Sequence, residues 1–104
     1  MDKKDVIKIT RKYLARLAQN DFDIETAYVF GSFAKGNYQK DSDIDLAIVV
    51  RNLTDSFDME IKSMVVRQKE ETIIEPHLFD KSEFNDSNPF VSEIIRTGFE
   101  IELN

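Results

Sequence analysis

The chain has 104 residues, of which 41% are hydrophobic and 33% charged, and this composition predicts one soluble globular domain over residues 1–104. It contains no cysteine, which excludes disulfides, thiolate zinc sites and cysteine nucleophiles and fits a reducing, cytoplasmic location. The formal net charge of −6 argues against tight nonspecific binding to nucleic acid, which depends on basic surfaces. No apolar run approaches the ~20 residues that a membrane span requires, so no membrane association is expected.

The first half of the chain predicts a helix, two strands and a second helix. Residues 2–20 form an amphipathic helix, because apolar side chains recur every three or four residues, at Val6, Ile9, Tyr13, Leu14 and Leu17. Strands are expected over residues 25–30 and 44–50. Thr54 is the predicted cap of a second helix reaching about Glu70, with apolar residues at helical spacing, at Phe57, Ile61, Met64 and Val65. Met59 and Met64 are expected to fill the core.

The second half predicts a third strand, a last helix and a closing strand. In residues 72–79, Ile74 and Leu78 share one face while Glu75 and His77 share the other, and Pro76 favours a position at the sheet edge. Residues 80–86 are polar, with room for one helical turn. Asn88 and Pro89 begin a helix that ends at Gly98, before alternating residues at 99–103. This order predicts an α+β fold with a mixed sheet and helices mainly on one face.

The stretch over residues 28–50, YVFGSFAKGNYQKDSDIDLAIVV, carries the candidate site. Gly31 permits a close approach of backbone to a ligand, and Ser32 supplies a hydroxyl and an N–H group to a phosphate. Asp43 and Asp45 lie two apart on an expected strand and therefore project to the same side, where paired carboxylates suit Mg²⁺. The simpler interpretations are that Gly31 and Gly36 only form turns, that Ser32 caps a helix, and that the two acids are solvated at the end of a strand. They leave unexplained a carboxylate at Asp45, which apolar residues enclose.

The motif of Gly31-Ser32, ten residues, and Asp43-x-Asp45 with Ser42 before the acids resembles the nucleotidyltransferase superfamily of DNA polymerase β. The chain is most similar there to the minimal nucleotidyltransferases (MNT), which the closing segment NPFVSEIIRTGFEIE also resembles. The resemblance implies the mixed-sheet nucleotidyltransferase fold, ATP as donor, and two Mg²⁺ ions held by Asp43, Asp45 and a third carboxylate. Glu75 is the candidate for that carboxylate, as a metal ligand or general base, although many relatives carry aspartate there.

Three other polar residues have two interpretations each. Lys35 and Lys40 either neutralise the triphosphate or are ordinary surface lysines. His77, the only histidine, is either a packed or surface residue or a contact with substrate.

The resemblance further implies a partner, because larger relatives carry an additional acceptor-binding domain for which 104 residues leave no room. MNT proteins pair with small helical HEPN proteins, often toxins, and some inactivate them by adenylylation. We therefore expect an antitoxin that moves AMP from ATP to a hydroxyl, expected to be a tyrosine, of a HEPN-type partner, in a hetero-oligomer or as a homodimer. One alternative is a non-catalytic nucleotide-binding module that neutralises its partner by contact. The other is a transferase for a small molecule or an RNA end.

Overall fold

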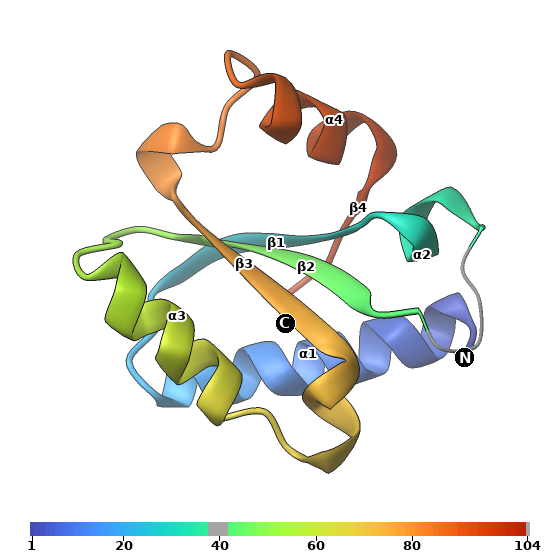
Figure 1. Ribbon diagram of the computed structural model, residues 1–104, viewed down its shortest axis with the longest axis horizontal. Coiled ribbons are helices and arrows are strands. Elements are labelled where there is room, and N and C mark those ends of the chain that lie inside the picture. The colour runs from blue at the N-terminus through green and yellow to red at the C-terminus, as the bar shows by residue number, and fades with distance from the viewer. Residues whose placement is uncertain (38–41, 104) are drawn as a thin grey trace.

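The computed structural model describes residues 1–37 and 42–103, which form a four-stranded mixed sheet with helices on both sides (Figure 1). The strands are β1 (Ile24–Phe30), β2 (Ile44–Val50), β3 (Ile74–Asp80) and β4 (Phe99–Glu100), in the spatial order β3-β2-β1-β4. β1 pairs antiparallel with β2 and β4, whereas β2 and β3 are parallel. The predicted α+β fold is confirmed, and β3 is the edge strand that Pro76 indicated.

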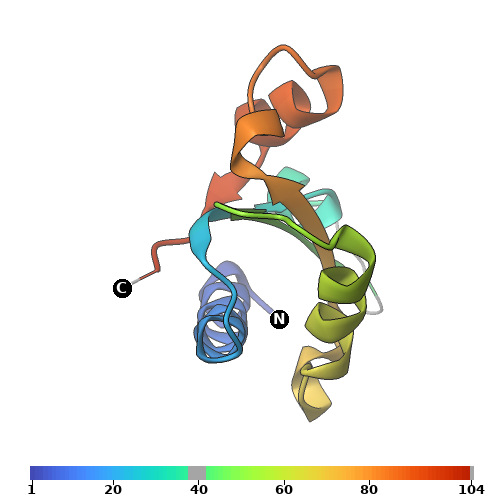
Figure 2. The ribbon, with the colours of Figure 1, turned by 90° about the vertical axis from the view of Figure 1, so that its left-hand side faces the viewer.

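The two longest helices lie against one face of the sheet, and a third helix lies against the other. α1 (Lys3–Gln19) and α3 (Ser56–Val65) occupy the first side, and α4 (Pro89–Thr97) lies across the sheet from them (Figures 1 and 2). The short helix α2 (Ser32–Lys35) follows β1, and the 3₁₀ turns η1 (Lys69–Ile73) and η2 (Lys81–Glu83) flank β3. No helix in residues 1–37 and 42–103 has the length and apolar character needed to span a bilayer.

The core lies between α1 and the sheet. All five predicted apolar positions of α1 are buried there: Val6, Ile9, Tyr13, Leu14 and Leu17. Alternate strand residues and two residues outside the strands, Phe22 and Ile101, complete the core: Phe22, Ala27, Val29, Ile44, Leu46, Ile48, Val50, Ile74, Leu78 and Ile101. Burial of each aliphatic side chain of this kind stabilises the folded state by about 1.5–3 kcal/mol. Because side chains alternate along a strand, this pattern directs Asp45, Glu75 and His77 to the opposite face.

The second helix differs from the prediction at both ends. Its cap is Asp55 rather than Thr54, since the Asp55 carboxylate accepts a hydrogen bond from the Asp58 N–H at 3.3 Å. It ends at Val65 rather than near Glu70, because Arg67 Nε donates to the Met64 carbonyl at 3.0 Å. Arg67 Nη1 also donates to the Ile74 carbonyl at 2.9 Å, so this side chain joins the end of α3 to the start of β3.

Four of the five large apolar residues of α3 face solvent, which the helical periodicity alone did not indicate. Phe57 and Val65 are 70% and 75% exposed, and Ile61 and Met64 are each 46% exposed; we refer to these four residues as the α3 apolar face. The prediction that Met64 fills the core was wrong, whereas Met59 is partly buried against the core as expected. The inward side of α3 carries buried Ser63, whose carbonyl accepts a 2.5 Å hydrogen bond from the Tyr13 hydroxyl of α1.

The segment before β3 is held by a long-range ion pair. Glu71 lies in η1 with a fully buried side chain, and Arg16 of α1 donates a hydrogen bond to its carboxylate. Burial raises the pKa of the Glu71 carboxyl, but hydrogen bonds from Arg16 and the Gln68 N–H outweigh it, so the net pKa lies below the ordinary value. The expected strand at 72–79 therefore begins two residues later, at Ile74.

The C-terminal elements follow the prediction closely. The Asn88 side chain caps α4 by accepting from the Phe90 N–H at 2.9 Å, Pro89 is its first residue, and Gly98 ends it. The expected turn after β3 is η2. The closing strand is shorter than residues 99–103, although the Ile101 N–H still donates to the Ala27 carbonyl at 2.8 Å.

Candidate functional site

Three titratable side chains meet where the parallel strands β2 and β3 begin. The register pairs Asp45 with Glu75 and, two residues further on, Ala47 with His77. All three side chains point away from the core between α1 and the sheet. One ligand atom from each of Asp45, Glu75 and His77 can be chosen so that all lie within 4.8 Å of one another. We refer to these three residues as the acid–histidine cluster.

The cluster is accessible to solvent without being fully exposed. His77 Nε2 lies 3.3 Å from Asp45 Oδ1, and about one third of each of the two side chains is exposed (32% and 29%). Glu75 is exposed. Two neighbouring carboxylates repel one another unless a cation lies between them. Carboxylate and imidazole donors that converge in this way fit a divalent metal ion.

Gly31 forms the wall of the site beside Asp45. Its backbone has φ 76° and ψ −148°, a region that only glycine adopts without strain. A Cβ atom at this position would lie 2.4 Å from Asp45 Oδ2. Backbone conformation and close packing therefore both require glycine. The register explains the contact, since Phe30, the residue before Gly31, pairs with Asp45.

Aromatic rings support the histidine from β1 and α4. The Phe30 ring meets the His77 ring edge to face, with centroids 5.1 Å apart, and Phe30 in turn meets Phe90 of α4 at 5.8 Å. Such pairs restrict ring orientation and contribute about 0.5–1.5 kcal/mol beyond their buried area. The imidazole is thus oriented toward Asp45 by packing against the Phe30 ring.

The remaining predicted site residues occupy different positions. Asp43 is exposed, precedes β2, and is not part of the acid–histidine cluster. Ser32 is the first residue of α2, and the cap is Gly31, which has no side chain to accept a capping bond; the capping interpretation of Ser32 was therefore wrong. Lys35 is half exposed, with Nζ 3.9 Å from Glu93 Oε1 of α4. Lys40 lies outside the described residues.

A cleft of about 230 Å³ adjoins the cluster between α2 and α4. Its lining residues include Phe30 and Gly31, which touch His77 and Asp45, together with Lys35, Phe90 and Glu93. The cleft therefore combines apolar rings with the paired charges of Lys35 and Glu93, and it shares Phe30 and Gly31 with the surroundings of the cluster. This combination suits a nucleotide, whose base is flat and whose phosphates are anionic.

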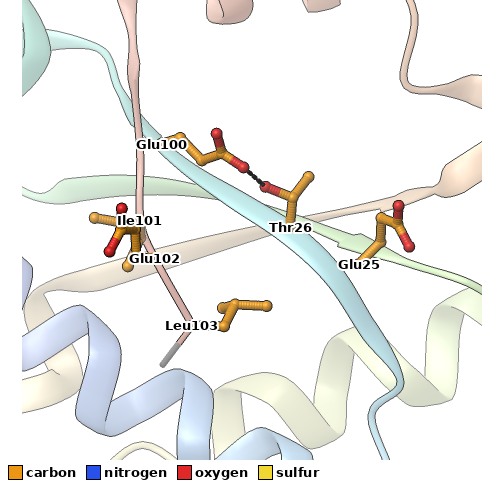
Figure 3. Close-up of a pocket in the computed structure, with 6 residues that line it drawn as sticks. All are labelled: Glu25, Thr26, Glu100, Ile101, Glu102 and Leu103. Carbon is orange, nitrogen blue, oxygen red and sulfur yellow. Dashed lines mark hydrogen bonds between the residues drawn. The ribbon is translucent and has the colours of Figure 1, made fainter.

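A larger hollow of about 330 Å³ lies at the other edge of the sheet, where β4 pairs with β1 (Figure 3). Glu25, Glu100 and Glu102 line it, and the Thr26 hydroxyl donates to Glu100 Oε2 at 2.6 Å. None of its six lining residues is basic, so it is poorly suited to a triphosphate. None of them belongs to the acid–histidine cluster either. The size of a hollow is therefore a poor guide to the site in this protein.

The sequence left the role of His77 undecided, and the structure places it in the cluster. The available signal was its position two residues after Glu75 on the same face of an expected strand. That signal becomes decisive only with the parallel register of β2 and β3, which determines which residues of the two strands are neighbours.

Comparison with known proteins gives consistent results. A family model for the polymerase beta nucleotidyltransferase domain matches residues 12–102. Among solved structures, a candidate nucleotidyltransferase from Sulfolobus solfataricus has a TM-score of 0.59 and 23% identity, over 74% of this chain and 68% of the other. A toxin–antitoxin structure with AMP-PNP has a TM-score of 0.58 and 16% identity, over 90% and 73% of the two chains. A mutant of the toxin–antitoxin MntA-HpeT has a TM-score of 0.59 and 14% identity, over 100% and 75%. No curated protein sequence matches the chain.

Proposed function

The chain belongs to the polymerase beta nucleotidyltransferase family, and we propose that it moves AMP from ATP to a tyrosine hydroxyl of a helical HEPN-type partner, as the antitoxin of a toxin–antitoxin pair. The observation that carries the proposal is the convergence of Asp45, Glu75 and His77 beside the Gly31 turn. A nucleotidyltransferase needs anionic ligands for a metal and a place for phosphates next to them, and the cluster with its adjoining cleft supports the proposal on both counts.

Each predicted site residue that lies within residues 1–37 and 42–103 has a proposed role in the transfer. Asp45 and Glu75 would hold Mg²⁺, with Asp43 as the additional carboxylate expected for a pair of ions. When bound, the metal would polarise the phosphates and lower the pKa of the attacking hydroxyl. The backbone N–H groups of Gly31 and Ser32 orient the triphosphate. Lys35 neutralises phosphate charge once it leaves its 3.9 Å contact with Glu93.

The transfer itself is an in-line substitution at the α-phosphorus. The acceptor oxygen forms a bond to this phosphorus while the bond to the oxygen that bridges the α- and β-phosphates breaks, and pyrophosphate leaves. The hydroxyl proton passes to the Glu75 carboxylate, whose exposed position lets it reach an acceptor held outside the cluster. Positioning and neutralisation of charge supply most of the rate in such transfers.

The α3 apolar face supports a protein acceptor. Ile61 comes four residues after Phe57, and Met64 and Val65 come three and four residues after Ile61, which is the spacing that packs against a neighbouring helix. Large apolar side chains on one exposed helix face indicate an interaction surface. Two structures with a similar fold are toxin–antitoxin structures, one of them with AMP-PNP. We propose that the helical partner binds on this face and that ATP, in the cytoplasm, is the donor.

Incubation with ATP tests the proposal directly. The purified chain, MgCl₂ and the protein encoded by the neighbouring reading frame are mixed with ATP labelled at the α-phosphate or, in parallel, at the γ-phosphate. Only the α-label is expected to appear on a tyrosine of the partner, because AMP is transferred and pyrophosphate is released. Asp45→Asn is expected to abolish labelling without unfolding the chain. The matched control is Glu102→Gln, the same change of charge at an exposed residue outside the cluster. Labelling retained by Asp45→Asn would contradict the proposal.

A contact-only binding module is the second candidate, and the α3 apolar face favours it equally. The two candidates differ in the effect of Asp45→Asn on the partner. If the chain acts by contact alone, Asp45→Asn still neutralises the partner, whereas Ile61→Asp does not. If it acts by transfer, either substitution abolishes neutralisation.

A further inference from the structure

We propose that His77 Nε2 is a direct ligand of the cation held by Asp45 and Glu75, and that this imidazole makes the site bind Mn²⁺ more tightly than Mg²⁺. The inference rests on the proposed function only in placing a metal at the acid–histidine cluster. It adds a residue whose role the sequence left open and a metal preference that two or three carboxylates alone would not create.

The first argument is the geometry of the three donors. Asp45 and Glu75 face each other across the parallel pair, and His77 reaches Asp45 diagonally from two residues further along β3. The chosen ligand atoms all lie within 4.8 Å of one another. An ion about 2.1 Å from each donor brings them to roughly 3–4 Å, so the side chains need only small rotations to surround it.

The second argument is that the contact between His77 and Asp45 is a poor ion pair. Nε2 and Oδ1 are 3.3 Å apart, whereas a charge-assisted N–H···O⁻ bond is about 2.7–2.9 Å long. The imidazole is oriented instead by the Phe30 ring, and Asp45 is positioned by its contact with Gly31. The two side chains are thus held close together by their surroundings rather than by their mutual attraction, as expected for ligands prepared to share an ion.

The third argument is charge. Within residues 1–37 and 42–103, Asp45 forms no ion pair with a lysine or an arginine, and its side-chain contact is with His77. Two converging carboxylates that lack a lysine or arginine partner favour a bound cation between them.

The chemistry of the donor set determines the preference. Mg²⁺ takes oxygen ligands and keeps several waters, whereas imidazole suits first-row transition metals. Mn²⁺ accepts carboxylates and water as Mg²⁺ does but also accepts an imidazole nitrogen. It is the weakest binder of its series, which makes it the strictest probe of a contribution from His77.

Binding of MnCl₂ and MgCl₂ to the intact chain, with and without a non-hydrolysable ATP analogue, tests the inference. The fraction of free Mn²⁺ is measured by electron paramagnetic resonance, and Mg²⁺ affinity by its competition with Mn²⁺. Wild type is expected to bind Mn²⁺ at least about tenfold more tightly than Mg²⁺. His77→Gln is expected to lose about tenfold in Mn²⁺ affinity while its Mg²⁺ affinity changes less than about threefold. Asp45→Asn should lower the affinity for both ions, and Glu102→Gln should change neither affinity.

A measurement on wild type alone keeps the inference testable if His77→Gln does not fold. Because His77 is the only histidine, its ring nitrogens give one isolated set of ¹⁵N signals. Diamagnetic Zn²⁺ is expected to shift the Nε2 signal strongly, as direct ligation does, and trace Mn²⁺ to broaden it.

If His77→Gln lowered the affinities for Mn²⁺ and Mg²⁺ equally, His77 would only position Asp45, and the inference would be wrong. It would also be wrong if neither affinity changed, or if Zn²⁺ left the Nε2 signal in place. Failure of wild type to bind either metal, even with nucleotide, would instead overturn the proposed function.

Discussion

Substitution of Gly31 by alanine tests the packing that holds Asp45 in the site. The new Cβ would lie 2.4 Å from Asp45 Oδ2 and 3.3 Å from its Cγ, so one side must move. The main chain at φ 76° and ψ −148° adds strain of about 1–3 kcal/mol for any residue with a Cβ. Relief of the overlap by moving Asp45 adds about 1 kcal/mol, the low end for overpacking, because the carboxylate is partly exposed. We expect Gly31→Ala to lower the free energy of unfolding by about 2–4 kcal/mol in total.

Gly36→Ala measures the cost of backbone strain without any overlap with a neighbouring side chain. Gly36 also has a positive φ, 77°, but nothing lies within 4 Å of a Cβ placed there. Its left-handed conformation costs alanine about 1 kcal/mol. The two substitutions therefore differ mainly by the contact with Asp45 and by the greater strain at Gly31.

Urea unfolding followed by circular dichroism measures both variants, and Mn²⁺ binding measures the consequence for the site. Gly31→Ala is expected to lose at least 1 kcal/mol more than Gly36→Ala, and its Mn²⁺ affinity is expected to fall about tenfold because a ligand is displaced. The reasoning is refuted if the two variants are equally stable and Gly31→Ala binds Mn²⁺ as wild type does.

Three further predictions concern stability and partner binding. Glu71→Gln should lower the free energy of unfolding by about 2–3 kcal/mol. This is less than the 3–5 kcal/mol lost when one partner of a fully buried ion pair is removed, because Arg16 is partly exposed. Since the pKa of Glu71 is lowered, its stabilisation is present above the ordinary value of 4.5 and lost as pH falls through the folded pKa; the loss caused by Glu71→Gln in urea unfolding should therefore shrink between pH 7 and pH 3. Tyr13→Phe should cost about 1 kcal/mol by leaving the Ser63 carbonyl unpaired, and because burial raises the pKa of Tyr13 to about 12, that cost should be constant from pH 6 to pH 9. Ile61→Asp should lower partner affinity at least about tenfold in titration calorimetry while lowering the unfolding free energy by only about 1 kcal/mol, since nearly half of the residue is already exposed; an unchanged affinity would exclude the α3 apolar face as the contact.

Local patterns were sufficient to predict most of the elements. Alternation along β2 and β3 predicted which side chains enter the core, and Pro76 predicted an edge strand because it cannot donate a ladder hydrogen bond. Asn88 and Pro89 predicted the start of α4 because both preferences act within one turn of the chain. In each case the physical cause lies within a few residues of its effect.

Two misplaced boundaries follow from side-chain bonds that cross the turn before β3 or come from another helix. α3 ends at Val65, and β3 begins at Ile74, because Arg67 bonds carbonyls on either side of the turn and Arg16 pairs with Glu71 from another helix. A side chain that acts across 55 residues leaves no trace in a local periodicity. The pairing of His77 with the acids has the same origin, because the register of two strands 30 residues apart determines it.

The α3 apolar face shows a further limit of periodicity. A repeat of three and four residues predicts a helix with an apolar side, but it does not say whether that side meets the core or a partner. In α3 the inward side is the less apolar one, where Ser63 is buried and its carbonyl accepts from Tyr13, and the apolar side faces outward. Exposed apolar area of this kind lowers solubility unless something covers it, so its presence favours a partner rather than a free monomer.

The site and the α3 apolar face lie on different surfaces of the sheet, since α3 shares the side of α1 while Asp45 and Glu75 point away from it. A partner that binds α3 would therefore have to extend a segment around the edge strand β3 to bring the proposed tyrosine acceptor to the cluster. This geometry predicts that partner variants truncated in that segment still bind the chain but are no longer labelled from ATP.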